Sequence, residues 1–92
     1  MGSITENIHL PIDVIASFNT LEEIRPLYFR LENQEHERIT LQIEDVLTHK
    51  EMKLAGIRVI KYYCRAQMEG ELHYCELVYH IDKHVWKLQS IE

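Results

Sequence analysis

The stretch that decides the fold, residues 57–82, reads IRVIKYYCRAQMEGELHYCELVYHID. It consists of two runs rich in β-branched and aromatic residues, separated by Glu69-Gly70, which is the pattern of two antiparallel strands joined by a tight turn. Two turns fit this spacing. A two-residue loop keeps the pairing regular, whereas a type I turn with Gly70 as a bulge shifts the pairing by one residue and mixes the two faces. The two-residue loop is the preferred interpretation.

The preferred turn gives this hairpin two different faces. Met68 lies opposite Glu71, and the other partners follow by counting outward from the turn. The first face is almost wholly apolar and pairs Ala66 with His73, Cys64 with Cys75, Tyr62 with Leu77, and Ile60 with Tyr79. The second face mixes charges with aromatic rings and pairs Arg65 with Tyr74, Tyr63 with Glu76, Lys61 with Val78, and Val59 with His80. We expect the first face to be buried and the second to meet water.

The composition fits one small domain. The chain has 92 residues, of which 46% are hydrophobic, and a domain of this size buries roughly 60–70% of the surface of its unfolded chain. No run approaches the roughly 18 apolar residues of a membrane-spanning helix, and the first residues do not resemble a signal peptide. Two cysteines are too few for a disulfide framework. We therefore expect a soluble, cytoplasmic protein with reduced thiols and no membrane partner.

The net charge of −5 is unevenly spread along the chain. Residues 49–68 carry five bases and one acid, so the middle of an acidic chain is locally positive. An acidic protein is in general a poor binder of nucleic acid, although a local basic face can hold a small anion. Solvated lysines on a strand face are the default interpretation of these bases.

The remaining segments also alternate between apolar and polar residues. This alternation predicts four further strands, at residues 12–18, 24–31, 38–43 and 85–91. Pro26 has no N–H to donate, so it belongs at an edge or a bulge, and the shift of the apolar phase at Val46 predicts a bulge that bends its strand. Residues 48–55 have a helix-forming composition but are too few for a stable helix, so we expect a loop with at most one helical turn. Residues 1–11 read as a mobile leader before a single domain of residues 12–92.

Six strands joined by short connections predict an all-β protein, an antiparallel meander that curls into a small barrel or half-barrel. A two-sheet sandwich is the alternative architecture. The predicted core consists of the apolar side chains that keep the inward phase in each run: Val14, Phe18, Leu27, Phe29, Leu41, Ile43, Ile60, Tyr62, Leu77, Tyr79, Trp86 and Leu88.

Six short blocks of sequence carry a resemblance to a known family. The blocks are IDVIA, PLYFR, KLAG, YCR, ELVY and WKL, which begin at Ile12, Pro26, Lys53, Tyr63, Glu76 and Trp86. Over residues 12–88 the chain resembles a family of uncharacterised small bacterial proteins, a domain of unknown function that is expected to be all-β. The resemblance implies a single small bacterial domain. None of the blocks is a chemical motif, so it implies no activity and no catalytic residue.

Histidines and cysteines raise the question of a metal site or an active site. His73, Cys64 and Cys75 share the apolar face of the hairpin, but the chain has no CxxC, HExxH or other paired-ligand spacing. It also lacks GxSxG, a P-loop and GxGxxG, and no spacing sets two carboxylates around a substrate. The sequence therefore predicts no catalytic residue, no metal and no cofactor, and an enzyme is the less favoured class.

Two functional hypotheses remain. The leading one is a noncatalytic interaction module that binds a protein partner, or a second copy of itself, through the edge strands of the meander. The alternative is a binder of nucleic acid or a small anion through Lys61, Tyr63, Arg65 and Tyr74, because cations neutralise phosphate and aromatic rings stack on planar groups. The acidic composition disfavours nucleic acid as the partner.

Overall fold

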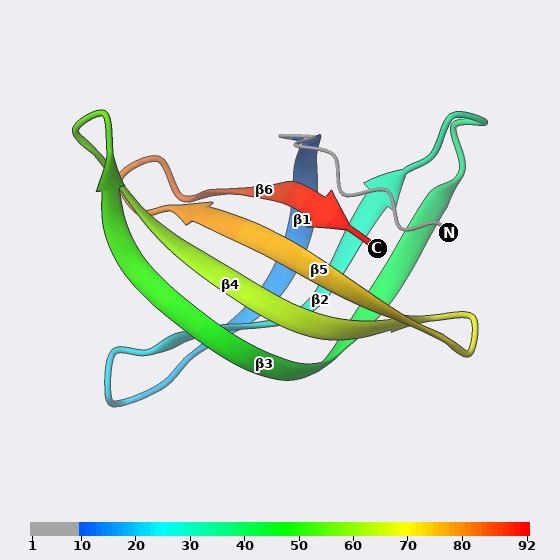
Figure 1. Cartoon of the computed structure of the whole chain (residues 1–92), viewed down its shortest axis with the longest axis horizontal. Helices are drawn as coiled ribbons and strands as arrows, with labels where there is room; N and C mark the ends of the chain where they lie inside the picture. The colour runs from blue at the N-terminus through cyan, green and yellow to red at the C-terminus, as the bar shows by residue number, and fades with distance from the viewer. Residues whose placement is uncertain (1–9) are drawn as a thin grey trace.

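The computed structural model describes residues 10–92 as six strands and no helix. Each strand pairs with the next in antiparallel order, and the last returns to the first, so that the sheet closes into a small barrel (Figure 1). The predicted all-β antiparallel meander is confirmed, and of the predicted barrel and half-barrel the structure shows the barrel. The strands are β1 (Leu10–Phe18), β2 (Ile24–Glu32), β3 (Arg38–Leu54), β4 (Ile57–Met68), β5 (Glu71–His80) and β6 (Val85–Ile91).

Closure of the barrel depends on a short seam between the first and last strands. Leu10, Pro11 and Ile12 of β1 face Leu88, Lys87 and Trp86 of β6. Leu10 and Pro11, which the sequence assigned to the leader, therefore belong to the domain. The rest of the predicted leader, residues 1–9, lies outside the described residues.

The central hairpin has the predicted two-residue turn. Glu69 and Gly70 both adopt left-handed backbone angles, with φ of 52° and 82°, which is the geometry of a type I′ turn. Met68 faces Glu71 and Cys64 faces Cys75, and every other predicted pair of the hairpin is also present. The preferred register is confirmed, and the bulged alternative is wrong.

Residues 48–55 differ from the prediction, because they form no loop or helical turn. β3 continues unbroken to Leu54, and a second tight turn at Ala55-Gly56, with φ of 51° and 84°, leads directly into β4. Pairing with β4 satisfies the backbone groups of every second residue of this segment, whereas a helix of that length would lack enough internal hydrogen bonds. The predicted bulge near Val46 is confirmed, since the register shifts between Ile43 and Asp45 and again between Val46 and Thr48.

The barrel interior holds most of the predicted core. Phe29, Leu41, Leu77 and Leu88 are almost completely buried, Tyr62, Tyr79, Trp86 and Ile43 are also buried, and Val14 and Ile60 pack against them half-buried. Two assignments are wrong. Phe18 is 66% exposed, because it lies at the end of β1, beyond the seam with β6. Leu27 is the extra residue at the bulge between β1 and β2, and the neighbouring Pro26, as predicted for a bulge, takes the buried position.

The outer face of the central hairpin is less open to water than its sequence suggests. Val59 and Val78 are buried there, although they lie outside the main core cluster. Val78 stands between Lys61 of β4 and Lys87 of β6, which are both half-buried. Aliphatic lysine stems cover apolar neighbours while their charged ends stay in water, so part of this face is shielded without being apolar throughout.

Cys64 and Cys75 are buried neighbours across the central hairpin and do not form a disulfide, as predicted. Burial raises the pKa of both thiols to about 12, so they stay protonated at neutral pH. In this position the two residues act as small core side chains.

Two phenylalanines on neighbouring strands give a matched test of the core. Phe29→Ala should lower the free energy of unfolding by about 3–5 kcal/mol, because the ring is buried and leaves a cavity. Phe18→Ala should cost less than about 1 kcal/mol, because its ring is largely in water. Urea unfolding followed by the fluorescence of Trp86 measures both. Equal losses in the two variants would contradict the assignment of the core.

Candidate docking cleft along β3

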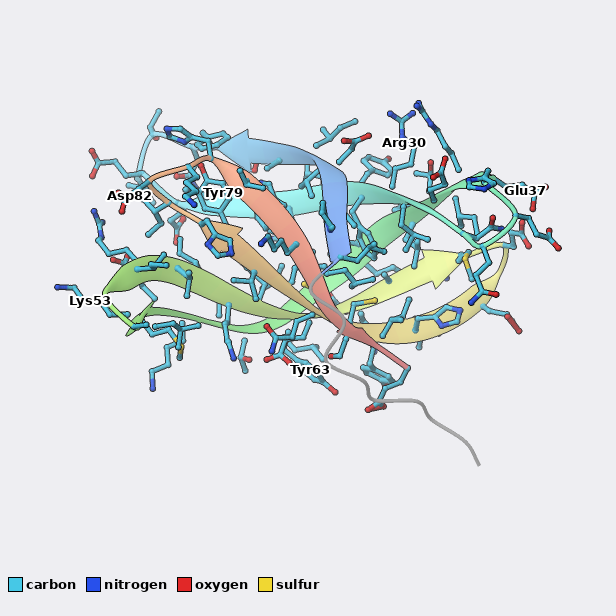
Figure 2. The ribbon with its side chains drawn as sticks, turned by 90° about the horizontal axis from the view of Figure 1, so that it is seen from above. Arg30, Glu37, Lys53, Tyr63, Tyr79 and Asp82 are labelled. Atoms are coloured by element: carbon cyan, nitrogen blue, oxygen red, sulfur yellow. The ribbon has the colours of Figure 1, made fainter. Side chains whose placement is uncertain are left out.

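The meander gathers alternate turns at opposite ends of the barrel. The β1–β2, β3–β4 and β5–β6 turns lie at one end, and the β2–β3 and β4–β5 turns lie at the other (Figure 1). Figure 2 shows Lys53 of β3 and Asp82 of the β5–β6 turn at the first end, and Glu37 at the second. We call the end with the β1–β2, β3–β4 and β5–β6 turns the cleft end.

β3 separates from β2 at the cleft end. The two strands pair only where residues 28–32 of β2 face residues 38–42 of β3. From Ile43 onward β3 bends away at its two bulges, and Figure 1 shows it curving off from β2. Within residues 10–92, the part of β3 from Ile43 to Leu54 is therefore paired on one side only, with β4.

The register identifies which backbone groups face the open side. Leu54 and Ile57 flank a two-residue turn and so form a hydrogen-bonded pair, and such pairs recur at every second residue of an antiparallel ladder. The residues between them direct their backbone groups away from the partner strand. In β3 these are His49, Glu51 and Lys53. Their N–H and C=O groups form an unpaired edge.

A cleft of about 520 Å³ lies between this edge and the β1–β2 hairpin. The hairpin contributes Glu22, Glu23 and Arg25 to its lining, and β3 contributes His49 and Glu51. Its volume falls within the range of pockets that bind small molecules or side chains. The cleft is thus a gap in the barrel wall with a strand edge along one side.

The wall opposite β3 is held by a side-chain cap. The Oδ1 atom of Asn19 accepts hydrogen bonds from the backbone N–H groups of Leu21 and Glu23, both at 2.9 Å, and its Nδ2 donates to Oε1 of Glu23 at 2.8 Å. Glu22 takes the left-handed position of the turn, with φ of 64°. The β2–β3 turn repeats the arrangement with Asn33 as the acceptor. An Asn followed four residues later by Glu is the signal that sequence reasoning missed.

The floor of the cleft is aromatic. The ring of Tyr62 stacks on that of His49, with centroids 5.9 Å apart, and also contacts the ring of Trp86, with centroids 5.4 Å apart. The Tyr62 hydroxyl donates a hydrogen bond to the backbone O of Ile24 at 2.6 Å, which ties the β1–β2 hairpin to β4. Burial raises the pKa of Tyr62 to about 12, so the phenol retains this proton at neutral pH.

Carboxylates outnumber cations in the cleft. Glu22, Glu23 and Glu51 line it together with the single guanidinium of Arg25. Arg58 lies outside the lining and approaches Glu51 at 3.5 Å, but both side chains are about half exposed, and exposed ion pairs are weak. The carboxylate of Glu51 is therefore accessible to another cation.

Apolar side chains surround the same end of the barrel. Phe18 and Leu21 come from the β1–β2 hairpin, Leu54 and Ile57 flank the β3–β4 turn, and Val85 follows the β5–β6 turn, with exposed fractions between 37% and 76%. None of them lines the cleft, and by the register Leu54, Ile57 and Val85 belong to the outer face of the sheet, so these residues add apolar surface beside the cleft. We call these five residues the apolar rim.

The site residues predicted from the sequence lie elsewhere, on the outer face of β4 and β5. Tyr63 points away from the barrel in Figure 2, and its ring stacks on that of Tyr74 with centroids 6.2 Å apart. Arg65 forms an ion pair with Asp45 of β3, so a carboxylate accompanies its charge on this face. Lys61 is half-buried on the same face. The structure thus brings the two tyrosines together and pairs Arg65 with Asp45.

A different basic cluster lies on this outer face. Lys50 of β3 faces Lys61 of β4, Lys61 faces Val78, and Val78 faces Lys87 of β6, so three lysines share one row across four strands. None of the three forms an ion pair within 4 Å among the described residues. Treating Ala55-Gly56 as a turn like Glu69-Gly70 would have revealed the row from the sequence. We call it the lysine row.

In the described part of the chain, no group of three or more His, Cys, Asp or Glu side chains is placed to hold a metal ion. His73, considered with the two cysteines as a ligand, lies with its Nδ1 3.1 Å from the backbone O of Glu92. None of the secondary structure between residues 10 and 92 is a helix of the length and apolarity that a membrane crossing requires.

Comparison of the chain with protein-family models, with curated proteins and with solved structures finds no match. The resemblance to a family of uncharacterised bacterial all-β proteins therefore stays a prediction.

Proposed function

We propose that this protein is a noncatalytic interaction module that binds an extended segment of a partner protein along the open edge of β3. The observation that carries the proposal is the unpaired edge formed by His49, Glu51 and Lys53, which borders a cleft instead of open solvent. An extended peptide that adds to a sheet edge gains main-chain hydrogen bonds, and its alternate side chains occupy pockets that select the sequence.

The surroundings of the edge favour a peptide over a second barrel. The capped β1–β2 hairpin stands across the cleft from β3, so the opening admits a single strand more readily than a whole sheet. Lys50 and Lys53 also lie along this edge, and lysines on an edge discourage pairing with an identical strand. Self-association through β3 is therefore the less favoured use of the same edge.

A proline at position 51 tests the proposal. The N–H of Glu51 points into the cleft, so Glu51→Pro removes an edge donor and leaves the β3–β4 ladder intact. The matched control is Glu51→Ala, which loses the same carboxylate but keeps the N–H. The probes are fluorescent peptides acetyl-Thr-Val-Thr-Xaa-Thr-Val-Thr-amide with Lys, Gln or Glu at Xaa. Binding is measured by anisotropy, and folding of each variant by circular dichroism.

We expect at least one peptide to bind, and the proline variant to bind it about tenfold more weakly than the alanine control. Equal affinities of the two variants, or no binding of any peptide to the native sequence, would contradict the proposal. Analytical ultracentrifugation at several protein concentrations tests whether a second copy of the protein occupies the edge instead of a peptide. A dimer that dissociates only in Glu51→Pro would assign the edge to a second copy and overturn the peptide proposal.

The second candidate function is the binding of a phosphate-bearing anion on the outer face. The observation that favours it is the lysine row, in which Lys50 and Lys61 face each other directly although like charges in that position are destabilising. A bound anion would relieve the repulsion. The stacked pair of Tyr63 and Tyr74 lies on the same face of the hairpin. In this form the candidate keeps Lys61 and the two tyrosines but replaces Arg65, which Asp45 already engages.

Salt dependence tests this second candidate. A single-stranded oligothymidine should bind at low salt, with a dissociation constant that rises steeply as salt is added. Lys61→Gln should weaken binding and reduce the salt slope by about 1, whereas Lys83→Gln in the exposed β5–β6 turn should change neither. Inorganic phosphate as competitor separates recognition of phosphate alone from recognition of the chain. Absence of binding at low salt would remove the candidate.

A further inference from the structure

The side chains of β3 that face the cleft indicate which kind of segment can bind along its edge. His49 and Glu51 present their backbone groups to the open side and their side chains to the cleft lining. In a paired strand, the residue directly opposite projects its side chain to the same face of the sheet. The residue of a bound segment that faces Glu51 therefore directs its side chain into the cleft.

The charges in the cleft determine which side chain fits there. Glu51 and Glu22 are contributed by opposite walls, and Glu23 lies beside Glu22 on the hairpin. The Glu23 carboxylate already accepts a hydrogen bond from Asn19, whereas Glu22 forms no ion pair within the described residues. The cationic groups near this place are Arg25 in the lining, Arg58 beside Glu51, and Lys53, which lies outside the lining two residues from Glu51 on the same face of β3. Within the lining itself, three carboxylates stand against one guanidinium, so a cationic side chain that enters the cleft meets more carboxylates than cations there.

An aromatic ring gives a long side chain one further contact. The exposed imidazole of His49, which stacks on the buried ring of Tyr62, lines the cleft, and the methylene stem of a lysine or the guanidinium plane of an arginine can rest on it. An acidic side chain in this position would face the same carboxylates and be repelled.

We propose that the segment bound along β3 carries a lysine or arginine that enters the cleft opposite Glu51, between the two acidic walls and against the exposed ring of His49. The inference rests on the proposed function, because it names the specificity of the same edge. It identifies the occupant by chemistry: an extended peptide with a basic residue at an inward position. Charge complementarity in the cleft selects the basic side chain, and hydrogen bonds to the backbone of β3 hold the segment.

A charge-reversal experiment tests the specificity. The peptide acetyl-Thr-Val-Thr-Lys-Thr-Val-Thr-amide is compared with its Glu counterpart on the native sequence, Glu51→Gln, Glu51→Lys and Glu71→Lys. Glu71 lies in the β4–β5 hairpin at the end opposite the cleft, so Glu71→Lys changes the net charge as Glu51→Lys does but away from the cleft. The readout is the ratio of the two dissociation constants at low salt.

We expect the native protein to bind the Lys peptide about tenfold more tightly than the Glu peptide, because the carboxylates of the cleft attract the lysine and repel the glutamate. The preference should shrink in Glu51→Gln, reverse in Glu51→Lys and persist in Glu71→Lys. An unchanged preference in Glu51→Lys, or equal affinity for both peptides on the native protein, overturns the inference. If binding in that case still depends on the N–H at position 51, the proposed function stands without this specificity. If the Lys, Glu and Gln peptides all fail to bind the native protein, both the proposed function and this specificity are wrong.

Discussion

The structure depends on the unequal pairing of β3. Along its whole length after Gln42 this strand is hydrogen-bonded to β4, but it shares only five pairs with β2, from Tyr28–Gln42 to Glu32–Arg38. The two register shifts between Ile43 and Thr48 bend it away from β2 and toward the β4 side of the barrel. The barrel can then close at the β1–β6 seam while its wall stays open between β2 and β3. The cleft, its unpaired edge and its two acidic walls all follow from this bend.

Local interactions on each side of the opening stabilise the strands that border it. The Asn19 cap fixes the β1–β2 hairpin, and the Tyr62 hydroxyl binds the backbone of Ile24 beneath the gap. Two type I′ turns, at Ala55-Gly56 and Glu69-Gly70, match the twist of the strands that they join. The long hairpins therefore stay in register without a second neighbour along part of β3. A preformed edge of this kind reduces the ordering that a bound segment must impose on the protein.

Much of the fold could be predicted from the sequence, because period-two alternation and turn residues are local signals. The Glu69-Gly70 register and the buried positions of Phe29, Trp86 and Leu88 follow from such signals. Residues 48–55 were mispredicted because helix-forming composition does not reveal a partner strand, and Phe18 because alternation does not reveal where the neighbouring strand ends. The cleft depends on the point at which β2 and β3 separate, and no local sequence signal marks that point. The predicted basic face stays a prediction, and the pairing of Arg65 with Asp45 on that face could be found only from the β3–β4 register.

Native-state hydrogen exchange of the β3 amides tests the open edge most directly. If β3 is paired on one side only, the amides of His49, Glu51 and Lys53 should exchange with little protection. Those of Lys50 and Met52, which bond to β4, should exchange slower by a factor on the order of 10² or more. This alternation, measured by NMR on the dilute protein, is the result that the structure predicts. Uniform strong protection of all five amides would mean that another strand covers the edge, and would contradict the account.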